Sequence, residues 1–199
     1  MPLIDQAMRE AALSPGELDL VAVTAGPGSF TAIRAGLAAA RGIALATGAL
    51  LLGLSGFEAV AASFPFPGAT QEEGPKEGPS LLVALESRRA DLYVALFDDR
   101  GEPLLPPLSL LPEALAAALG GAPFAKGLVI AGDAAVRAAA ALPTQSVTRI
   151  EAERVPDALG VLRAAFRSWR RGVRENAARP MYLRAPDVTI PRAKKAKAR

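Results

Sequence analysis

The order of apolar and polar positions predicts a strand, a turn and a long helix in the first quarter of the chain. Residues 18–23 are almost continuously apolar, which is typical of a strand buried on both faces of a parallel sheet. Glycine and proline at 26–28 then interrupt the pattern, because proline cannot continue a sheet ladder. Apolar residues next recur at helical spacing over 29–47, with Ser29 or Thr31 able to cap the helix; they are Ile33, Leu37, Ala40 and Ala44.

Similar patterns predict an alternation of strands and helices along the rest of the chain, and this alternation indicates an α/β fold. We expect strands at 50–54, 80–86, 91–97, 102–109 and 127–131, and helices at 3–13, 57–63, 113–119, 134–141 and 157–172. Proline, glycine and glutamate are concentrated between the second strand-helix pair and the third strand, which predicts a flexible connection. We therefore expect a first lobe at 1–66, a connection at 67–79, a second lobe at 80–190 and a disordered basic tail at 191–199.

Three of the predicted helices carry informative faces. The helix at 3–13 has one apolar side, formed by Leu3, Ile4, Ala7, Met8 and Ala11. The helix at 29–47 contains small residues that allow another element to approach closely: Ala35, Gly36, Ala38, Ala39 and Gly42. The helix at 157–172 has a predicted buried stripe of Leu159, Leu162, Ala165, Phe166 and Trp169. The chain end at Tyr182 and Leu183 is expected to dock on the core.

Composition removes several kinds of chemistry. The 199 residues include no cysteine, so the chain has neither a disulfide framework nor a thiolate metal site. They include no histidine either, the commonest metal ligand and general base, and we expect no metal site and no catalytic residue. No apolar run reaches membrane-spanning length and the start lacks a signal pattern, so we expect a cytoplasmic protein that does not bind membranes.

The net charge of +3 is concentrated at the chain end. The last eight residues carry five positive charges, and the remainder of the chain therefore has a net charge of −2. One interpretation is that this tail and the helix at 157–172 bind RNA. The helix contributes four arginines: Arg163, Arg167, Arg170 and Arg171. Solvated surface charge is the commoner explanation for both features.

The turn after the first strand has two readings. It is either a tight turn before a closely packed helix, or an anion site, since free amides at a helix start favour phosphate. The sequence is not a Walker A loop, because no lysine follows the second glycine. The residues of this candidate site are Gly26, Pro27, Gly28, Ser29, Phe30, Thr31 and Arg34. Arg88 and Arg89, in the short link between two later strands, could also meet an anion.

The amino-acid sequences of this turn and of three other segments resemble motifs of one protein family. AGPGSFTAIRAG is similar to the GPGSFTGLRIG signature of the TsaB (YeaZ) family. LLGLSGFEAVA resembles its GVSSLEALA segment, LVALESRRADLY its strand ending in DARRgEvY, and the run from Arg179 to Arg184 its closing P-x-YLR. Separated matches in the same order are much more specific than one motif.

The sequence also departs from the family pattern. Ala32 replaces the second glycine of GSFTG, and Glu86 and Ser87 stand where the family often has Asp-Ala. The family opens with a hairpin-rich segment before the first helix, whereas Met1 here directly precedes that helix. We therefore expect three opening strands, roughly 30 residues, to be missing from the first lobe; a start codon assigned too far downstream or a shortened chain would explain this.

The resemblance implies an actin-like ATPase (ribonuclease H-like) fold of two lobes, the first one truncated. It implies a subunit without catalytic activity that binds and activates a TsaD-like catalytic subunit. That complex places threonylcarbamoyl on adenosine 37 of transfer RNA, uses ATP and includes a TsaE-like ATPase. This chain would then contact tRNA only indirectly, bind no cofactor itself, and form a homodimer when alone. The residues expected to bind the partner are Leu3, Ile4, Ala7, Met8, Ala11, Ile33, Leu37 and Arg41.

Two other functions remain open on the sequence. One is an ATP-dependent phosphotransferase of the same fold, which would need a phosphate-binding hairpin near the N-terminus. The other is an RNA-binding module that uses the basic tail and the arginine-rich helix.

Overall fold

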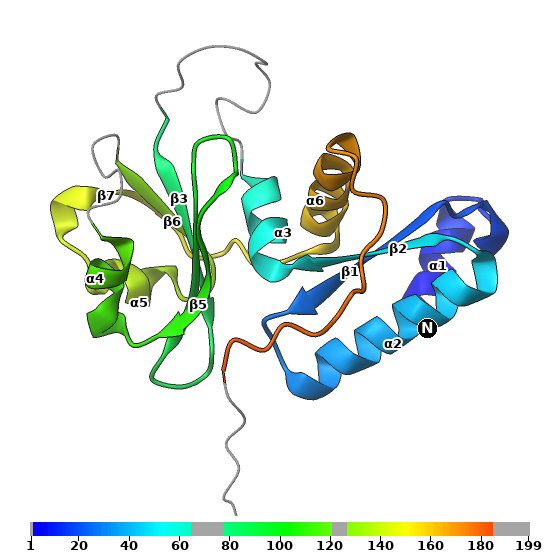
Figure 1. Ribbon diagram of the computed structural model, residues 1–199, viewed down its shortest axis with the longest axis horizontal. Coiled ribbons are helices and arrows are strands. Elements are labelled where there is room, and N and C mark those ends of the chain that lie inside the picture. The colour runs from blue at the N-terminus through cyan, green and yellow to red at the C-terminus, as the bar shows by residue number, and fades with distance from the viewer. Residues whose placement is uncertain (1, 65–77, 121–126, 185–199) are drawn as a thin grey trace, which may run out of the picture.

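The computed structural model describes residues 2–64, 78–120 and 127–184, and its strands form two separate sheets (Figure 1). The helices are α1 (Pro2–Glu10), α2 (Phe30–Thr47), α3 (Gly56–Ser63), α4 (Leu115–Leu119), α5 (Ala135–Ala140) and α6 (Ala158–Arg170). The strands are β1 (Leu20–Gly26), β2 (Leu50–Ser55), β3 (Ser80–Glu86), β4 (Leu92–Phe97), β5 (Pro103–Leu110), β6 (Leu128–Ala131) and β7 (Val147–Glu151). Short 3-10 helices are η1 (Pro15–Glu17), η2 (Pro112–Ala114) and η4 (Thr144–Ser146).

The smaller sheet consists of β1 and β2, which run parallel and are connected through α2. Leu37, Ala40 and Ala44 of α2 are buried, as the helical spacing predicted. The prediction that residues 18–23 form a strand buried on both faces is wrong, because positions 20–24 of β1 are only half-buried. Within the described residues each strand of this sheet has a single neighbour, so both are edge strands and neither is fully enclosed.

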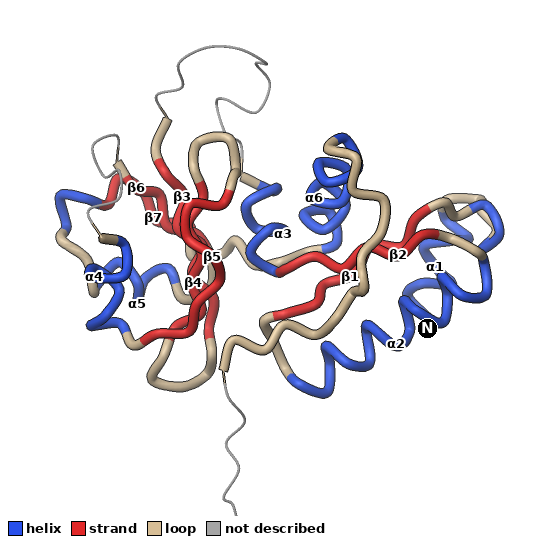
Figure 2. The backbone as a smooth tube through the Cα atoms, in the orientation of Figure 1, coloured by secondary structure: helices blue, strands red, loops and turns tan. Residues whose placement is uncertain are grey.

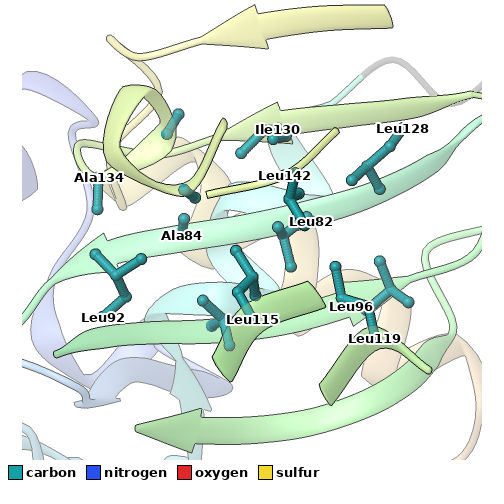
Figure 3. Packing of buried hydrophobic residues seen from close by; sticks show 13 residues of the cluster. Leu82, Ala84, Leu92, Leu96, Leu115, Leu119, Leu128, Ile130, Ala134 and Leu142 are labelled. Atoms are coloured by element: carbon teal, nitrogen blue, oxygen red, sulfur yellow. The ribbon is translucent and has the colours of Figure 1, made fainter. Parts of the chain in front are cut away.

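The larger sheet has the strand order β5-β4-β3-β6-β7, with β3 at its centre. β3 is antiparallel to β4 and parallel to β6. Successive side chains point to opposite faces of a strand, so this sheet has two cores. One core contains Leu82, Leu92 and Ile130 under α4 and α5, as Figure 3 shows. The other contains Leu81, Val83 and Phe97 and packs against α3.

Helix α3 lies between the two sheets (Figure 2) and is buried over most of its circumference. Its buried residues Phe57, Val60 and Ala61 belong to the core of the larger sheet, whereas Ala62 packs with the smaller sheet and α6. Ser55 caps the helix: its hydroxyl oxygen accepts a hydrogen bond from the Glu58 amide at 3.1 Å.

Helix α6 packs in a different orientation from the predicted one. Leu159, Leu162 and Phe166 are exposed by 52%, 63% and 58%, so the predicted apolar stripe is wrong at these positions. The buried residues are the small ones, Gly160, Ala164 and Ala165. A Cβ atom on Gly160 would lie 2.4 Å from the carbonyl oxygen of Ala59, which means that α6 approaches α3 too closely for a larger side chain.

The other predicted elements are present with ends shifted by a few residues, and β7 is an additional strand that the sequence analysis did not predict. Although α6 falls within the range expected for the second lobe, it packs with Leu52 and Leu54 of the first sheet. The expected connection at 67–79, except for its last two residues, and the basic tail at 191–199 lie outside the described residues. Among the described helices, none is long and apolar enough to cross a membrane.

We predict that Gly160→Ala lowers the free energy of unfolding by about 1–3 kcal/mol, the usual cost of overpacking a core. The added methyl group would meet the Ala59 carbonyl and, at 2.6 Å, the Ser63 hydroxyl. Gly36→Ala on α2 is the control, because a Cβ there has no atom within 4 Å and should stabilise the helix by roughly 0.5–1 kcal/mol. Urea unfolding of both variants measures the difference. Equal stability of Gly160→Ala and the parent chain would contradict the close contact.

Candidate functional site

The turn that follows β1 is held in place by residues 176–184, which we call the closing segment. The amide of Met181 donates a hydrogen bond to the Ala25 carbonyl at 2.7 Å. Gly26 has a φ of +130°, and a Cβ at this position would lie 3.0 Å from the Met181 carbonyl oxygen. Glycine is therefore required here both by the backbone angle and by the close passage of the closing segment.

An exposed cluster of one cation and two rings joins the start of α2 to the closing segment. The Phe30 and Tyr182 rings stack with centroids 5.9 Å apart. The Arg34 guanidinium lies 3.7 Å from the centre of the Phe30 ring and donates from Nε to the Tyr182 hydroxyl at 2.9 Å. The structure thus brings together two segments that resemble the same family and are about 150 positions apart. Leu183 packs on the core as predicted, but Tyr182 is 54% exposed.

The same closing segment is also fastened to β2 and α2. The Asn176 side chain accepts a hydrogen bond from the Gly53 amide and donates one to the Gly53 carbonyl, both at 2.8 Å. Arg41 donates to the carbonyl of Ala178 at 3.0 Å. Arg41, a predicted partner-binding residue, is therefore engaged within its own chain. Sequence reasoning missed Asn176, and only its position shortly before the closing motif could have pointed to it.

At its described end, the closing segment reaches the strand β4 through Arg184. Arg184 forms an ion pair with Asp91 at 3.3 Å, and the Asp91 side chain is only 13% exposed. Asp91 also accepts hydrogen bonds from the hydroxyls of Ser109 and Ser87. The Ser109 hydrogen bond lowers the pKa of Asp91 most; the Ser87 hydrogen bond and the Arg184 charge lower it further, against the opposing effect of burial.

A cavity of about 430 Å³ separates the turn after β1 from the link between β3 and β4. Gly28 and Ser29 line one side, and Glu86, Arg88 and Asp133 line the other. Ser29 stands at the N-cap position of α2, but its side chain makes no capping hydrogen bond. Arg88 is the one guanidinium among the described residues of the lining, beside the carboxylates of Glu86 and Asp133, so the cavity does not offer the several positive charges that suit a polyphosphate such as ATP. The residues present therefore do not fit the nucleotide that an actin-like fold implies.

The described part of the chain also lacks the side chains for a metal centre. No three His, Cys, Asp or Glu residues in it lie close enough together to hold an ion. The carboxylate of Glu86, which lines the cavity, forms an ion pair with Arg137 at 2.5 Å. Arg137 also donates to the carbonyls of Arg89 and Ala90, so this guanidinium holds the β3–β4 link in place.

The predicted partner-binding residues do not all lie on the surface. Leu3 and Ile4 are exposed by 81% and 40%, and Ala7 and Ala11 are exposed as well. Met8 and Ile33 are half-buried, whereas Leu37 is 1% exposed and belongs to the core. Leu37 therefore packs against its own sheet instead of being free to meet a partner.

A second exposed surface on α2 was missed. Its residues recur three and four positions apart, are exposed and face away from the sheet. We call this surface the α2 stripe; it consists of Thr31, Ala35, Ala38, Gly42 and Leu45. Leu45 is 88% exposed, and a Cβ on Gly42 would have no atom within 4 Å. The small residues were noted in the sequence, but their direction was not predicted.

The family profile described as TsaD, tRNA N6-adenosine threonylcarbamoyltransferase, matches residues 1–141, which is more than half of the chain. The chain belongs to this family. The predicted resemblance to the TsaB (YeaZ) family is confirmed by this match together with the solved YeaZ structures described below.

Individual members of the TsaD family match over shorter stretches. A tRNA N6-adenosine threonylcarbamoyltransferase of Lawsonia intracellularis is 46% identical over 54 residues, which are 27% of this chain and 15% of the relative. The enzyme of the same name from Anaeromyxobacter dehalogenans strain 2CP-1 is 35% identical over 96 residues, 48% of this chain and 27% of the relative. The aligned part thus spans less than a third of the length of these curated relatives.

Solved structures with the same fold cover nearly the whole chain. A Pseudomonas aeruginosa protein described as similar to peptidase YeaZ superposes with a TM-score of 0.74 and 24% identity, covering 92% of this chain and 82% of that one. YeaZ from Pseudomonas aeruginosa gives 0.71 and 22% with the same coverage. At this identity the likeness establishes the fold, and the predicted actin-like ATPase fold is confirmed.

We predict that Ser109→Ala lowers the free energy of unfolding by about 1–2 kcal/mol at pH 7, because the ionised Asp91 loses its strongest hydrogen-bond donor. A carboxylate with a lowered pKa in the folded state stabilises the fold above its unfolded pKa of about 4. This stabilisation disappears as the pH falls through the folded pKa. Urea unfolding at pH 7 and pH 3 should therefore show a difference between variant and parent that shrinks at pH 3. A difference of equal size at both pH values would exclude the charge of Asp91 as the cause.

Proposed function

We propose that this chain is a non-catalytic subunit in the formation of threonylcarbamoyladenosine in tRNA, and that it acts by docking on a TsaD-family transferase. The observation that carries the proposal is the family match over residues 1–141. Related proteins carry the transferase name, and an actin-like fold can dock on a homologue of itself through equivalent helices.

The absence of histidine and cysteine from the sequence supports a role without catalysis. So does the lining of the cavity beside the turn, where the guanidinium of Arg88 lies beside two carboxylates and does not suit a polyphosphate. A TsaE-like ATPase would supply ATP chemistry to the complex, and tRNA would be contacted through the transferase. The proposed site of action is the cytoplasm, where the related enzymes' substrate, tRNA, is modified.

The α2 stripe is the surface best suited to meet the transferase. Its residues recur three and four positions apart, as contact residues do on a helix that packs against another helix. Small residues at four of these positions allow a partner helix to approach closely. Leu45 would be the apolar anchor at one end. Without the transferase, we propose that a second copy of the chain covers this surface.

Leu45→Glu should weaken binding to the transferase at least tenfold, because an unpaired carboxylate would be buried in an apolar interface. The variant should fold normally, since Leu45 is 88% exposed. Met8 is a less direct choice, because it lines a hollow with Leu13 and Ile43 within its own chain.

Calorimetric titration of each variant with a purified TsaD-family transferase measures the effect. Ala32→Glu is the matched control, since it adds the same charge to an exposed position of α2 outside the stripe. If Leu45→Glu binds as tightly as the parent chain, the transferase docks elsewhere. Sedimentation of the parent chain and Leu45→Glu alone tests whether the homodimer uses the same surface.

We further predict that the chain alone releases no phosphate from ATP above the rate of buffer. The physical reason is that the cavity beside the turn has only one guanidinium in its described lining, and that the described residues contain no cluster of three side chains that could hold a metal ion. A phosphate-release assay on the isolated chain, with the assembled complex as positive control, measures this. Turnover by the isolated chain that Asp133→Asn abolishes would overturn the non-catalytic assignment.

A further inference from the structure

A second cavity, of about 320 Å³, lies between α3, α6 and the β4–β5 pair. It is separate from the turn after β1 and from the α2 stripe. Its walls are mainly apolar, and come from the larger sheet, from α3 and α6, and from the closing segment: Ala62, Ala95, Phe97, Leu105, Ala164 and Met181. A volume of this size lies at the small end of ordinary ligand pockets.

Most of the polar groups around this cavity are already occupied. The Ser55 hydroxyl donates to the Glu58 carboxylate at 2.7 Å, as part of the cap of α3. Arg171 donates to the carboxylate of Glu102 in an ion pair. These groups are therefore satisfied without a ligand.

Arg167 is the exception among the charged groups that line the cavity. It lies one turn of α6 beyond Ala164 and one turn before Arg171, so all three face the same side of the helix. Its side chain makes no hydrogen bond and no ion pair with any described residue, although it is only half-exposed. A guanidinium carries five N–H donors, and half-buried donors that lack partners cost free energy.

The surroundings of Arg167 do not compensate for this lack. Burial lowers the pKa of the Arg167 guanidinium, and the neighbouring Arg171 cation lowers it further; the carboxylates of Glu102 and Asp98 act in the opposite direction with a smaller effect. Glu102 is itself bound to Arg171. An anion that entered the cavity would pair with the Arg167 guanidinium. This pairing would offset both the free-energy cost of burying its charge and its repulsion by Arg171.

We propose that this cavity binds a small amphiphilic carboxylate, with its apolar body against Phe97, Leu105 and Met181 and its carboxylate on Arg167. The planar guanidinium fork matches a carboxylate in a bidentate arrangement, which a single ammonium group would not offer. The apolar walls supply the hydrophobic contribution to binding. This ligand site goes beyond the proposed function and does not depend on it.

Octanoate is the probe, because about ten non-hydrogen atoms suit a cavity of this size. Calorimetric titration of the full chain should give one saturable site for octanoate. Octanamide has the same shape without the charge and should bind at least tenfold more weakly. This comparison uses the parent chain only, so it does not depend on how any variant folds.

Arg167→Gln should weaken octanoate binding at least tenfold, while Arg163→Gln, on the exposed side of the same helix, should leave it unchanged. Ala62→Leu, which fills part of the cavity wall, should weaken octanoate and octanamide equally. Circular dichroism establishes that each variant is folded. Equal binding of octanoate and octanamide by the parent chain, or unchanged octanoate binding by folded Arg167→Gln, would overturn the proposal.

Discussion

Helix α3 is the element on which the arrangement of this protein depends. A helix that is apolar over most of its circumference is stable only when other elements cover those sides. The larger sheet covers one side of α3 with Leu81 and Val83, and α6 covers another. Within the part of the chain that the structure describes, the two sheets share no strand pairing, and α3 contributes residues to the cores of both. The close contact at Gly160 follows from the same constraint, since α6 must approach α3 within backbone distance.

Much of the fold could be predicted from the sequence because the strands of the larger sheet follow simple rules. β3 is a continuous apolar run, and its neighbours on both sides supply two cores, so the burial of residues such as Leu82 is evident from the pattern alone. β7 could not be found in this way, because Val147–Glu151 is an edge strand in which polar and charged residues predominate. Edge strands have only one partner, and the apolar signal is correspondingly weak.

The direction of α6 could not be predicted for a different reason. Apolar periodicity assigns the largest side chains to the core, and here it selected Leu162 and Phe166. The actual packing favours the smallest side chains, because Gly160 and Ala164 allow a closer helix pair than leucine would. The candidate site was predictable in part. The turn after β1 and the closing segment were both recognised by resemblance, but their contact through Phe30 and Tyr182 is a tertiary feature that no local pattern contains.

Exposed apolar residues are distributed unevenly over the molecule. The two most exposed large apolar side chains, Leu45 at 88% and Leu3 at 81%, belong to helices beside the smaller sheet, where β1 is only half-buried. Around the larger sheet, Leu104, Leu111 and Val136 are exposed to a smaller degree. The larger sheet, by contrast, has two well-covered cores. The part of the protein around β1 and β2 therefore has less apolar burial of its own, and its stability should depend more on what binds to it.

This unevenness separates the surfaces on which the two proposals rest. Helix α2, which carries the stripe, lies on the outer side of the smaller sheet (Figure 1). The cavity at Arg167 is instead lined by residues of α3, α6 and the β4–β5 pair. A partner on α2 would thus leave the cavity accessible. The two are still connected through the shared core of β2, α3 and α6, in which Leu54, Ala62 and Ala164 pack together. The closing segment is a second connection, because Met181 lines the cavity and Arg41 of α2 donates to the carbonyl of Ala178. An effect of the ligand on partner binding would have to pass through this core or through that segment, because no described residue of the α2 stripe also lines the cavity.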